Sequence, residues 1–217
     1  MQLFLDGSDI DKIRHYCGLG LIDGVTTNPS IILKSGKNMI EVISELAGIV
    51  SGSVSAEVSA LDSDTMVQEG IKLAEIAENV TVKLPITWDG LKACKTLSNK
   101  GISVNMTLCF SSSQALLAAK AGADYVSPFI GRLDDINLEG TDLISDIKLI
   151  YSNYKFSTKI LAASIRTINH VKQCARFGAD VATIPSDIFE KLVKHPLTDS
   201  GLSQFTADWE KTGQSII

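Results

Sequence analysis

The sequence of 217 residues predicts an α/β protein, a single-domain (β/α)8 TIM barrel over 1–217 with an additional C-terminal helical segment at 196–217. Short apolar runs alternate with helical patterns from residue 3 to about residue 195, which is typical of repeated βα units around a parallel sheet. Eight such units of about 27 residues fill this length, which makes a compact closed barrel. A flavodoxin-like sheet, the alternative, needs only about five strands.

The predicted strands are near-continuous apolar runs rather than strict alternations, as expected for strands whose outer face is covered by helices. In chain order they are Leu3–Asp6, Gly24–Asn28, Val54–Val58, Val80–Leu84, Ser103–Leu108, Tyr125–Phe129, Lys159–Ser164 and Val181–Ile184.

Apolar residues at helical spacing fill the segments between the strands. The first helix is expected to begin after Ser8 and to end at Gly18, because glycine is common just beyond a helix. The tripeptide Gly-Ala-Asp, at 122–124 and again at 178–180, is expected to end a helix and open a strand each time. This recurrence indicates an internal repeat.

The composition describes an ordinary globular protein, with 45% hydrophobic and 21% charged residues. A net charge of −5 argues against a nucleic-acid partner, which usually selects a basic surface. The N-terminal residues lack the basic and apolar regions of a signal peptide or membrane anchor, so we expect a cytoplasmic protein. Four scattered cysteines without a Cys-x-x-Cys motif are expected to be reduced core thiols.

Polar residues accumulate where the predicted strands end, and a barrel enzyme carries its reacting groups at that rim. The residues at the ends of the first seven strands are Asp6, Asn28, Glu57, Lys83, Thr107, Phe129 and Ser164. Residues two apart on a strand share a face, which adds Thr26, Asn105 and Ser127 to the same predicted site. A turn or cap explains any one of these residues, but not a convergent set.

Lys83 is the sharpest single feature, because it lies in the apolar run Val80–Pro85, where lysine is rarely buried without a partner. A free lysine is only about one part in a thousand neutral near pH 7.4, and attack on a carbonyl requires the neutral amine. Burial favours that neutral form. The alternative is a lysine that extends from the strand end into solvent.

Charged residues surround this position in the predicted barrel. Asp6 and Glu57 are able to share proton transfer with the lysine, or else form ion pairs with Lys83 or Arg132. Arg132 and Arg166 follow the sixth and seventh strands, where guanidinium groups bind phosphate unless they are simply solvated.

Competing motifs fail on inspection. The glycines at 18–24 do not match a dinucleotide fingerprint, and no Walker loop occurs. His15, His170 and His195 are too scattered for a metal site or a triad, so no metal is expected.

The ordered motifs resemble the transaldolase family over essentially the whole chain, and specifically its short subfamily that includes the fructose-6-phosphate aldolases. The motifs are Leu5-Asp6, 24–30 (GVTTNPS), 56–58 (AEV), 82–85 (VKLP), 105–110 (NMTLCF), 127–132 (SPFIGR) and 163–166 (ASIR).

The resemblance implies that Lys83 forms the Schiff base and that Asp6 is the acid–base residue in C3–C4 cleavage. It implies that Glu57 and Thr107 hold a proton-shuttling water. It further implies that the dihydroxyacetone fragment is bound by Asn28, Asn105 and Ser127. The phosphate is implied to be bound by Arg132, Ser164 and Arg166. The wall of the pocket is implied to be shaped by Thr26 and Phe129.

The reaction implied transfers dihydroxyacetone from sedoheptulose 7-phosphate to glyceraldehyde 3-phosphate, in the pentose phosphate pathway, with no cofactor because the imine is the electron sink. A fructose-6-phosphate aldolase is the first alternative, and a phosphosugar-binding barrel without turnover is the second. The aldolases resemble this chain but carry Gln and Tyr where it has Glu57 and Phe129, the pair typical of transaldolases.

Leu202, Phe205 and Trp209 stand at helical spacing in the tail, 196–217. They either pack on their own barrel or reach another subunit. In short members of the family the terminal helix contacts a neighbour in a ring, so the resemblance implies a ring-based homo-oligomer, for which a decamer is the common form.

Overall fold

The computed structural model describes residues 1–217 and contains a closed barrel in which the strands follow one another in chain order, β1 to β8, and all pair in parallel. The strands are β1 (Gln2–Asp6), β2 (Gly24–Thr26), β3 (Val54–Glu57), β4 (Val80–Pro85), β5 (Val104–Cys109), β6 (Tyr125–Pro128), β7 (Lys159–Ala162) and β8 (Val181–Pro185). The predicted (β/α)8 barrel with a C-terminal helix is therefore confirmed.

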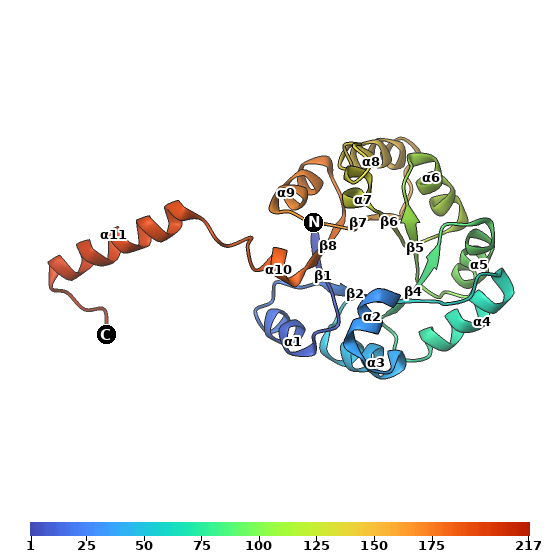
Figure 1. The fold of residues 1–217 in the computed structure, drawn as a ribbon, viewed down its shortest axis with the longest axis horizontal. Coiled ribbons are helices and arrows are strands. Elements are labelled where there is room, and N and C mark those ends of the chain that lie inside the picture. The colour runs from blue at the N-terminus through green and yellow to red at the C-terminus, as the bar shows by residue number, and fades with distance from the viewer.

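Helices surround the barrel as an outer ring, and α11 stands away from it (Figure 1). They are α1 (Ile10–Gly18), α2 (Pro29–Ser35), α3 (Met39–Ile49), α4 (Ser63–Ala74), α5 (Trp88–Ser98), α6 (Ser112–Ala121), α7 (Ile130–Asp134), α8 (Asp142–Tyr154), α9 (Ile168–Phe177), α10 (Ser186–Phe189) and α11 (Pro196–Thr212). A membrane-spanning segment would require a longer run of apolar residues than any of these helices contains.

Side-chain caps fix where several helices begin, because each satisfies a backbone N–H that the first turn leaves free. The cap of α1 is Asp9 rather than Ser8, and its carboxylate accepts from the amide of Lys12. Gly18 lies inside α1, and the left-handed glycine that follows is Gly20. The helix therefore begins one residue later than expected and ends at Gly18 as predicted, although Gly18 is its last helical residue rather than a glycine just beyond it.

Three predicted site residues lie beyond the strands that were expected to end with them. Asn28 lies beyond β2 and caps α2, where its side chain accepts from the amide of Ile31 at 3.0 Å. Phe129 forms only an isolated bridge to Ala163, and Ser164 has a left-handed backbone with φ of 60°. Each of these residues lies where the chain turns from the strand into the loop above the barrel.

The interior of the barrel is layered. Phe4, Leu161 and Val181 form a buried apolar cluster with Tyr125 packed against it. Residues two further along the same four strands share the inward face, and they are the more polar set Asp6, Ala163, Thr183 and Ser127. The barrel is thus filled by apolar side chains below and is polar towards the carboxyl ends of its strands.

All four cysteines are free thiols, as predicted. Cys94, Cys109 and Cys174 are buried, and burial raises the pKa of each of their thiols to about 12. Cys17 is only partly buried. Three of the four are therefore the core thiols that the sequence predicts.

Candidate active site

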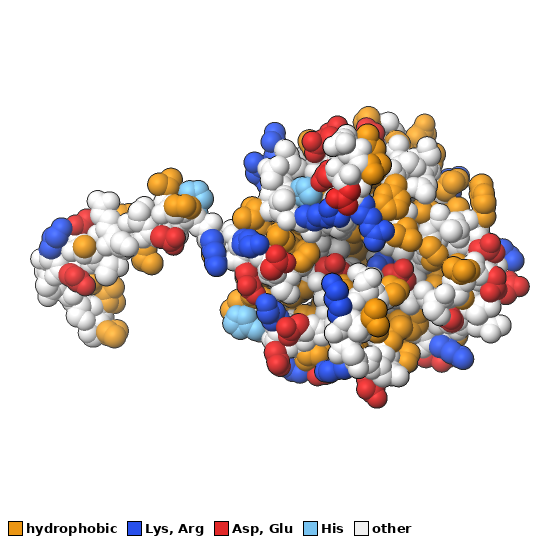
Figure 2. Space-filling model, in the orientation of Figure 1, with side chains coloured by type: hydrophobic (Ala, Val, Ile, Leu, Met, Phe, Trp, Pro, Cys, Tyr) orange, Lys and Arg blue, Asp and Glu red, His pale blue; other side chains and the backbone are white.

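A cavity of about 140 Å³ opens at the carboxyl end of the barrel. Its lining residues are Asp6, Thr26, Asn28, Lys83, Ser127, Phe129, Arg132, Ala163, Ser164 and Thr183. Figure 2 shows this end of the molecule hollowed at its centre, with acidic side chains in the hollow and basic side chains gathered over α7 on one side. Most of the predicted site residues therefore meet in one place.

Lys83 lies on the floor of this cavity and is only 5% exposed. Its Nζ lies 3.0 Å from Glu57 Oε2 and donates to the carbonyl oxygen of Thr27 at 3.2 Å. Glu57 stands directly beside Lys83 in the register of β3 and β4. The lysine is thus held inside the barrel by a carboxylate and a carbonyl, instead of extending into solvent.

Asp6 lines the same cavity from β1. Thr26 Oγ1 donates to Asp6 Oδ1 at 2.8 Å, and the Thr183 hydroxyl lies 2.6 Å from that of Thr26. Burial raises the pKa of Asp6 above its ordinary value of 3.8, while the Thr26 hydrogen bond and the positive charge of Lys83 lower it by less. The carboxyl group is therefore poised to exchange a proton more readily than a solvated aspartate.

Asn105 and Thr107 lie on β5, are fully buried and do not belong to the residues that line the cavity. Asn105 accepts from Ser127 Oγ at 2.8 Å and donates to Ser55 Oγ at 3.3 Å, which fixes its amide. Thr107 Oγ1 is buried and makes no hydrogen bond within the protein. That hydroxyl is consequently available to a small polar molecule.

The rim above β6 combines an aromatic ring with a cation. The ring of Phe129 packs edge-on against Phe110, with 5.7 Å between centroids, and the Arg132 guanidinium lies 4.9 Å from the Phe129 centroid. Gly131 passes close to the neighbouring loop, since a Cβ at Gly131 would lie 2.2 Å from the Ser164 carbonyl. This close approach holds Arg132 beside Ser164.

Arg166 is one of four predicted site residues that do not line the cavity; the others are Glu57, Asn105 and Thr107. Both of its terminal nitrogens donate to the Asp135 carboxylate, with NH2 at 2.7 Å from Oδ2, and Arg166 lowers the pKa of Asp135. The Arg166 amide also donates to His170 Nδ1 at 3.3 Å, and His170 Nε2 lies 2.9 Å from Asp134. The loop after β7 is thus tied to α7 by two carboxylates.

Thr183 and Asp135 are the residues at this end of the barrel that the sequence did not reveal. A signal for Thr183 existed, because it is the one polar residue in the predicted strand Val181–Ile184. No such signal marked Asp135, which belongs to an exposed turn.

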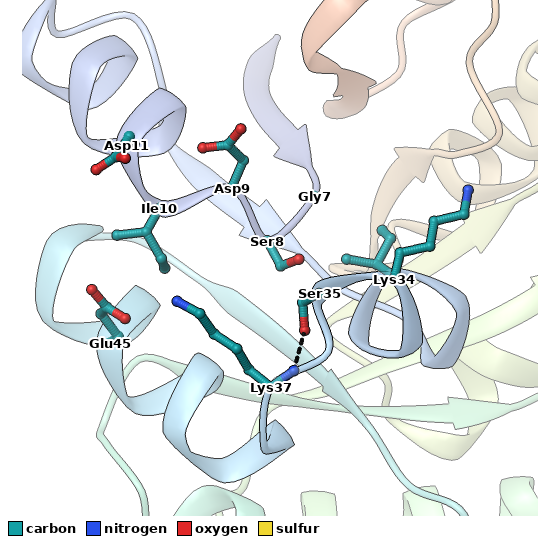
Figure 3. Close-up of a pocket in the computed structure, with 10 residues that line it drawn as sticks. Gly7, Ser8, Asp9, Ile10, Asp11, Lys34, Ser35, Lys37 and Glu45 are labelled. Atoms are coloured by element: carbon teal, nitrogen blue, oxygen red, sulfur yellow. Dashed lines mark hydrogen bonds between the residues drawn. The ribbon is translucent and has the colours of Figure 1, made fainter.

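A larger hollow of about 570 Å³ lies beside the barrel, between the loop after β1 and helices α2 and α3. Figure 3 shows Lys37 reaching across it towards Ile10 and Glu45, while Lys34 points away. Every residue that lines it is exposed or half-buried, and none is among the predicted site residues. The smaller cavity at the barrel mouth is therefore the candidate active site.

The chain was compared with known proteins. A family model described as Transaldolase/Fructose-6-phosphate aldolase matches residues 3–216. The chain is 65% identical over 217 residues to a probable transaldolase of Roseobacter denitrificans, with both chains covered in full. It is 61% identical over 217 residues to a probable transaldolase of Cereibacter sphaeroides, covering 99% of that protein. It is also 61% identical over 218 residues to one of Parvibaculum lavamentivorans, covering all of both chains. The chain therefore belongs to the transaldolase/fructose-6-phosphate aldolase family.

Proposed function

We propose that this protein is a cytoplasmic transaldolase that moves a dihydroxyacetone unit from sedoheptulose 7-phosphate to glyceraldehyde 3-phosphate through a Schiff base on Lys83. The products are erythrose 4-phosphate and fructose 6-phosphate, and the reaction belongs to the pentose phosphate pathway. The observation that carries the proposal is the buried Lys83, 3.0 Å from Glu57 at the bottom of a polar cavity that also exposes Asp6. The names of the relatives agree with it.

The first step is imine formation. The neutral Nζ of Lys83 attacks the ketose carbonyl at C2, and the carbinolamine then loses water to give an iminium. Glu57 lies close enough to take the proton from the amine and to return it to the departing hydroxyl, directly or through a water. The unpartnered hydroxyl of Thr107 is suited to hold such a water.

Asp6 performs the second step. Its carboxylate takes the proton of the C4 hydroxyl, the C3–C4 electron pair moves into the iminium, and the aldose leaves as an aldehyde. An enamine of dihydroxyacetone stays on Lys83. The raised pKa of Asp6 suits this work, because the carboxyl must accept a proton and then return it to the acceptor.

Polar side chains around the lysine hold the rest of the sugar. The proposal assigns the hydroxyls of the three-carbon fragment to Asn28, Asn105 and Ser127. In support, Asn28 and Ser127 line the cavity, and Asn105 accepts a hydrogen bond from Ser127. Thr26 and Phe129 line the same cavity and shape its wall. Arg132 and Ser164 bind the phosphate at the rim. Arg166 joins them by directing part of its guanidinium group, which now donates to Asp135, towards the phosphate.

Phe129 favours transfer over the alternative, release of free dihydroxyacetone by a fructose-6-phosphate aldolase. The enamine must remain unprotonated until an aldehyde arrives. The ring of Phe129 lines the cavity and offers no proton, whereas a phenol in its place would carry one. The structure gives no comparable reason to favour the aldolase.

We also propose that the protein assembles as a ring-based homo-oligomer. Phe205 is 73% and Trp209 44% exposed on α11, and the barrel carries an apolar groove of about 570 Å³ between α1 and the segment after α10. A second copy that offers α11 to such a surface would bury both.

Borohydride reduction with fructose 6-phosphate, followed by peptide mapping, tests the proposed function. The expected result is one reduced adduct, on Lys83. Lys83→Arg should abolish both adduct and turnover, because a guanidinium yields no neutral amine near neutral pH. Lys92→Arg, at a solvent-exposed lysine, should change neither. An adduct on another lysine, or a Lys83→Arg variant with wild-type turnover, would contradict the proposal.

A further inference from the structure

We propose that Thr183 is a positioning residue for the reaction: its hydroxyl donates to Thr26, so that the hydrogen of Thr26 stays directed at Asp6. The inference deepens the proposed function and rests on the role given there to Asp6.

Thr183 is placed for this role by the closure of the barrel. It lies on β8, which pairs with β1, and it faces the cavity together with Asp6 and Thr26. The side chain is buried, only 2% exposed, and its single hydrogen-bond partner is the hydroxyl of Thr26 at 2.6 Å. A threonine at this depth would usually bond to a backbone carbonyl, as Thr158 does with Ala123.

Counting hydrogens gives the direction of the chain. Each hydroxyl has one hydrogen, and an ionised carboxylate only accepts. Thr26 gives its hydrogen to Asp6 Oδ1 at 2.8 Å, so the hydrogen between the two threonines must come from Thr183. The order is Thr183 to Thr26 to Asp6.

This order has two consequences for Asp6. Oδ1 is occupied by the threonine chain, whereas Oδ2 accepts no hydrogen bond from the protein and is left for the C4 hydroxyl of the sugar. A hydroxyl that itself accepts a hydrogen bond is also a stronger donor, so Thr183 helps Thr26 to stabilise the carboxylate. The other charged groups that act on Asp6 are Lys83 on β4, which favours the carboxylate, and Glu57 on β3, which opposes it.

The test compares Thr183→Val, which keeps the shape but removes the donor, with Thr183→Ser, which restores it. In Thr183→Val, kcat for transfer should fall about fivefold, the size expected for one neutral hydrogen bond, while KM stays near the wild-type value. The acidic limb of the kcat profile should move to higher pH, because the carboxylate is less stabilised. Thr183→Ser should return both towards wild type. Borohydride should still label Lys83 in every variant.

Thr158→Val is the matched control, since it removes another buried hydroxyl far from Asp6 in the fold. It should lower stability without moving the pH profile. Thr183→Cys, whose thiol is a weak donor, replaces the valine variant if that variant does not fold, and it should show a partial shift. An unshifted acidic limb in Thr183→Val or Thr183→Cys, or a shifted one in Thr183→Ser, would overturn the inference. Failure of the wild-type protein to trap substrate on Lys83 would instead overturn the proposed function, and this inference with it.

Discussion

Asp6 is the group in the cavity whose ionisation the fold opposes. Burial raises its pKa above 3.8, and the hydrogen bond from Thr26 and the charge of Lys83 offset only part of this effect. In the unfolded chain the carboxyl ionises at its ordinary pKa, so between the two pKa values the folded protein binds more protons. The free energy of unfolding therefore falls as pH rises through this interval, and the whole loss is present above the folded pKa.

Asp6→Asn should consequently stabilise the protein at pH 7 while abolishing turnover. The amide keeps the shape and can still accept from Thr26, but it carries no charge to desolvate. Thermal unfolding should show a higher Tm for the variant at neutral pH, and the difference should disappear well below pH 3.8. Asp146→Asn, at an exposed position on α8, should leave Tm unchanged at either pH. A lower Tm for Asp6→Asn at pH 7 would show that its charge is a net stabiliser.

Phe129 is expected to keep the reaction on the transfer path. Transfer from fructose 6-phosphate to erythrose 4-phosphate should outrun release of dihydroxyacetone by at least about tenfold, equivalent to roughly 1.4 kcal/mol in barrier. Phe129→Tyr should narrow the ratio, because its phenol brings a proton into the cavity that Phe129 lines. The assay measures both products from one donor with and without acceptor. Phe110→Tyr, at a ring that packs behind Phe129, is the control and should preserve the ratio.

Three aspartates make the same hydrogen bond between neighbouring strands of the barrel. Asp23, Asp124 and Asp180 each precede a strand, and each Oδ2 accepts from the amide that lies 20 residues earlier, on the preceding strand, at 2.8, 3.0 and 2.8 Å. Two of them follow the left-handed glycines of the Gly-Ala-Asp repeat, Gly122 and Gly178. The aspartate of the Gly-Ala-Asp repeat therefore links the amino end of one strand to the amino end of the next through a hydrogen bond.

Asp180→Ala should destabilise the barrel without touching the site. The change leaves the Ile160 amide without its acceptor and Lys148 without its partner at 3.1 Å. Loss of a hydrogen bond to a charged group costs about 1.5–3 kcal/mol. Urea denaturation should show that the free energy of unfolding falls by this amount in Asp180→Ala. It should hardly change in Asp146→Ala, at an exposed position on α8. An equal response to both substitutions would remove the special role of Asp180.

The barrel and α11 each leave apolar surface uncovered. No residue of α11 is buried, and the helix stands clear of the outer ring (Figure 1). The barrel's apolar groove includes Tyr16, Phe189 and Leu192. Uncovered apolar surface of this extent is typical of contacts between subunits.

Phe205→Asp should therefore reduce the mass of the proposed oligomer, because it places a charge among the apolar side chains of α11. Light scattering after size-exclusion chromatography measures that mass at a fixed protein concentration. Gln204→Asp introduces the same charge at the neighbouring exposed position and should preserve the assembly. A Phe205→Asp variant of wild-type mass would show that α11 does not hold subunits together.

Local sequence patterns were enough to predict the number and order of the strands, and the rim of the barrel to which most of the site belongs. Those features follow from local patterns: an apolar run of about five residues is a strand, and a polar residue at its carboxyl end faces the mouth of a barrel. Strand ends were less accurate at Asn28, Phe129 and Ser164, because caps and left-handed residues terminate a strand through contacts that periodicity does not report.

The hydrogen-bond partners of the polar side chains became clear only in the folded barrel. Thr26 and Thr183 are 157 residues apart in the sequence, and they meet because β8 closes the barrel against β1. The pairing of Arg166 with Asp135 likewise joins two loops that are 31 residues apart. The periodicity of a strand shows which face a side chain occupies and how high it lies in the barrel. A hydrogen bond, however, requires a donor and an acceptor within about 3 Å of each other, and residues far apart in the sequence reach that distance only when the barrel folds.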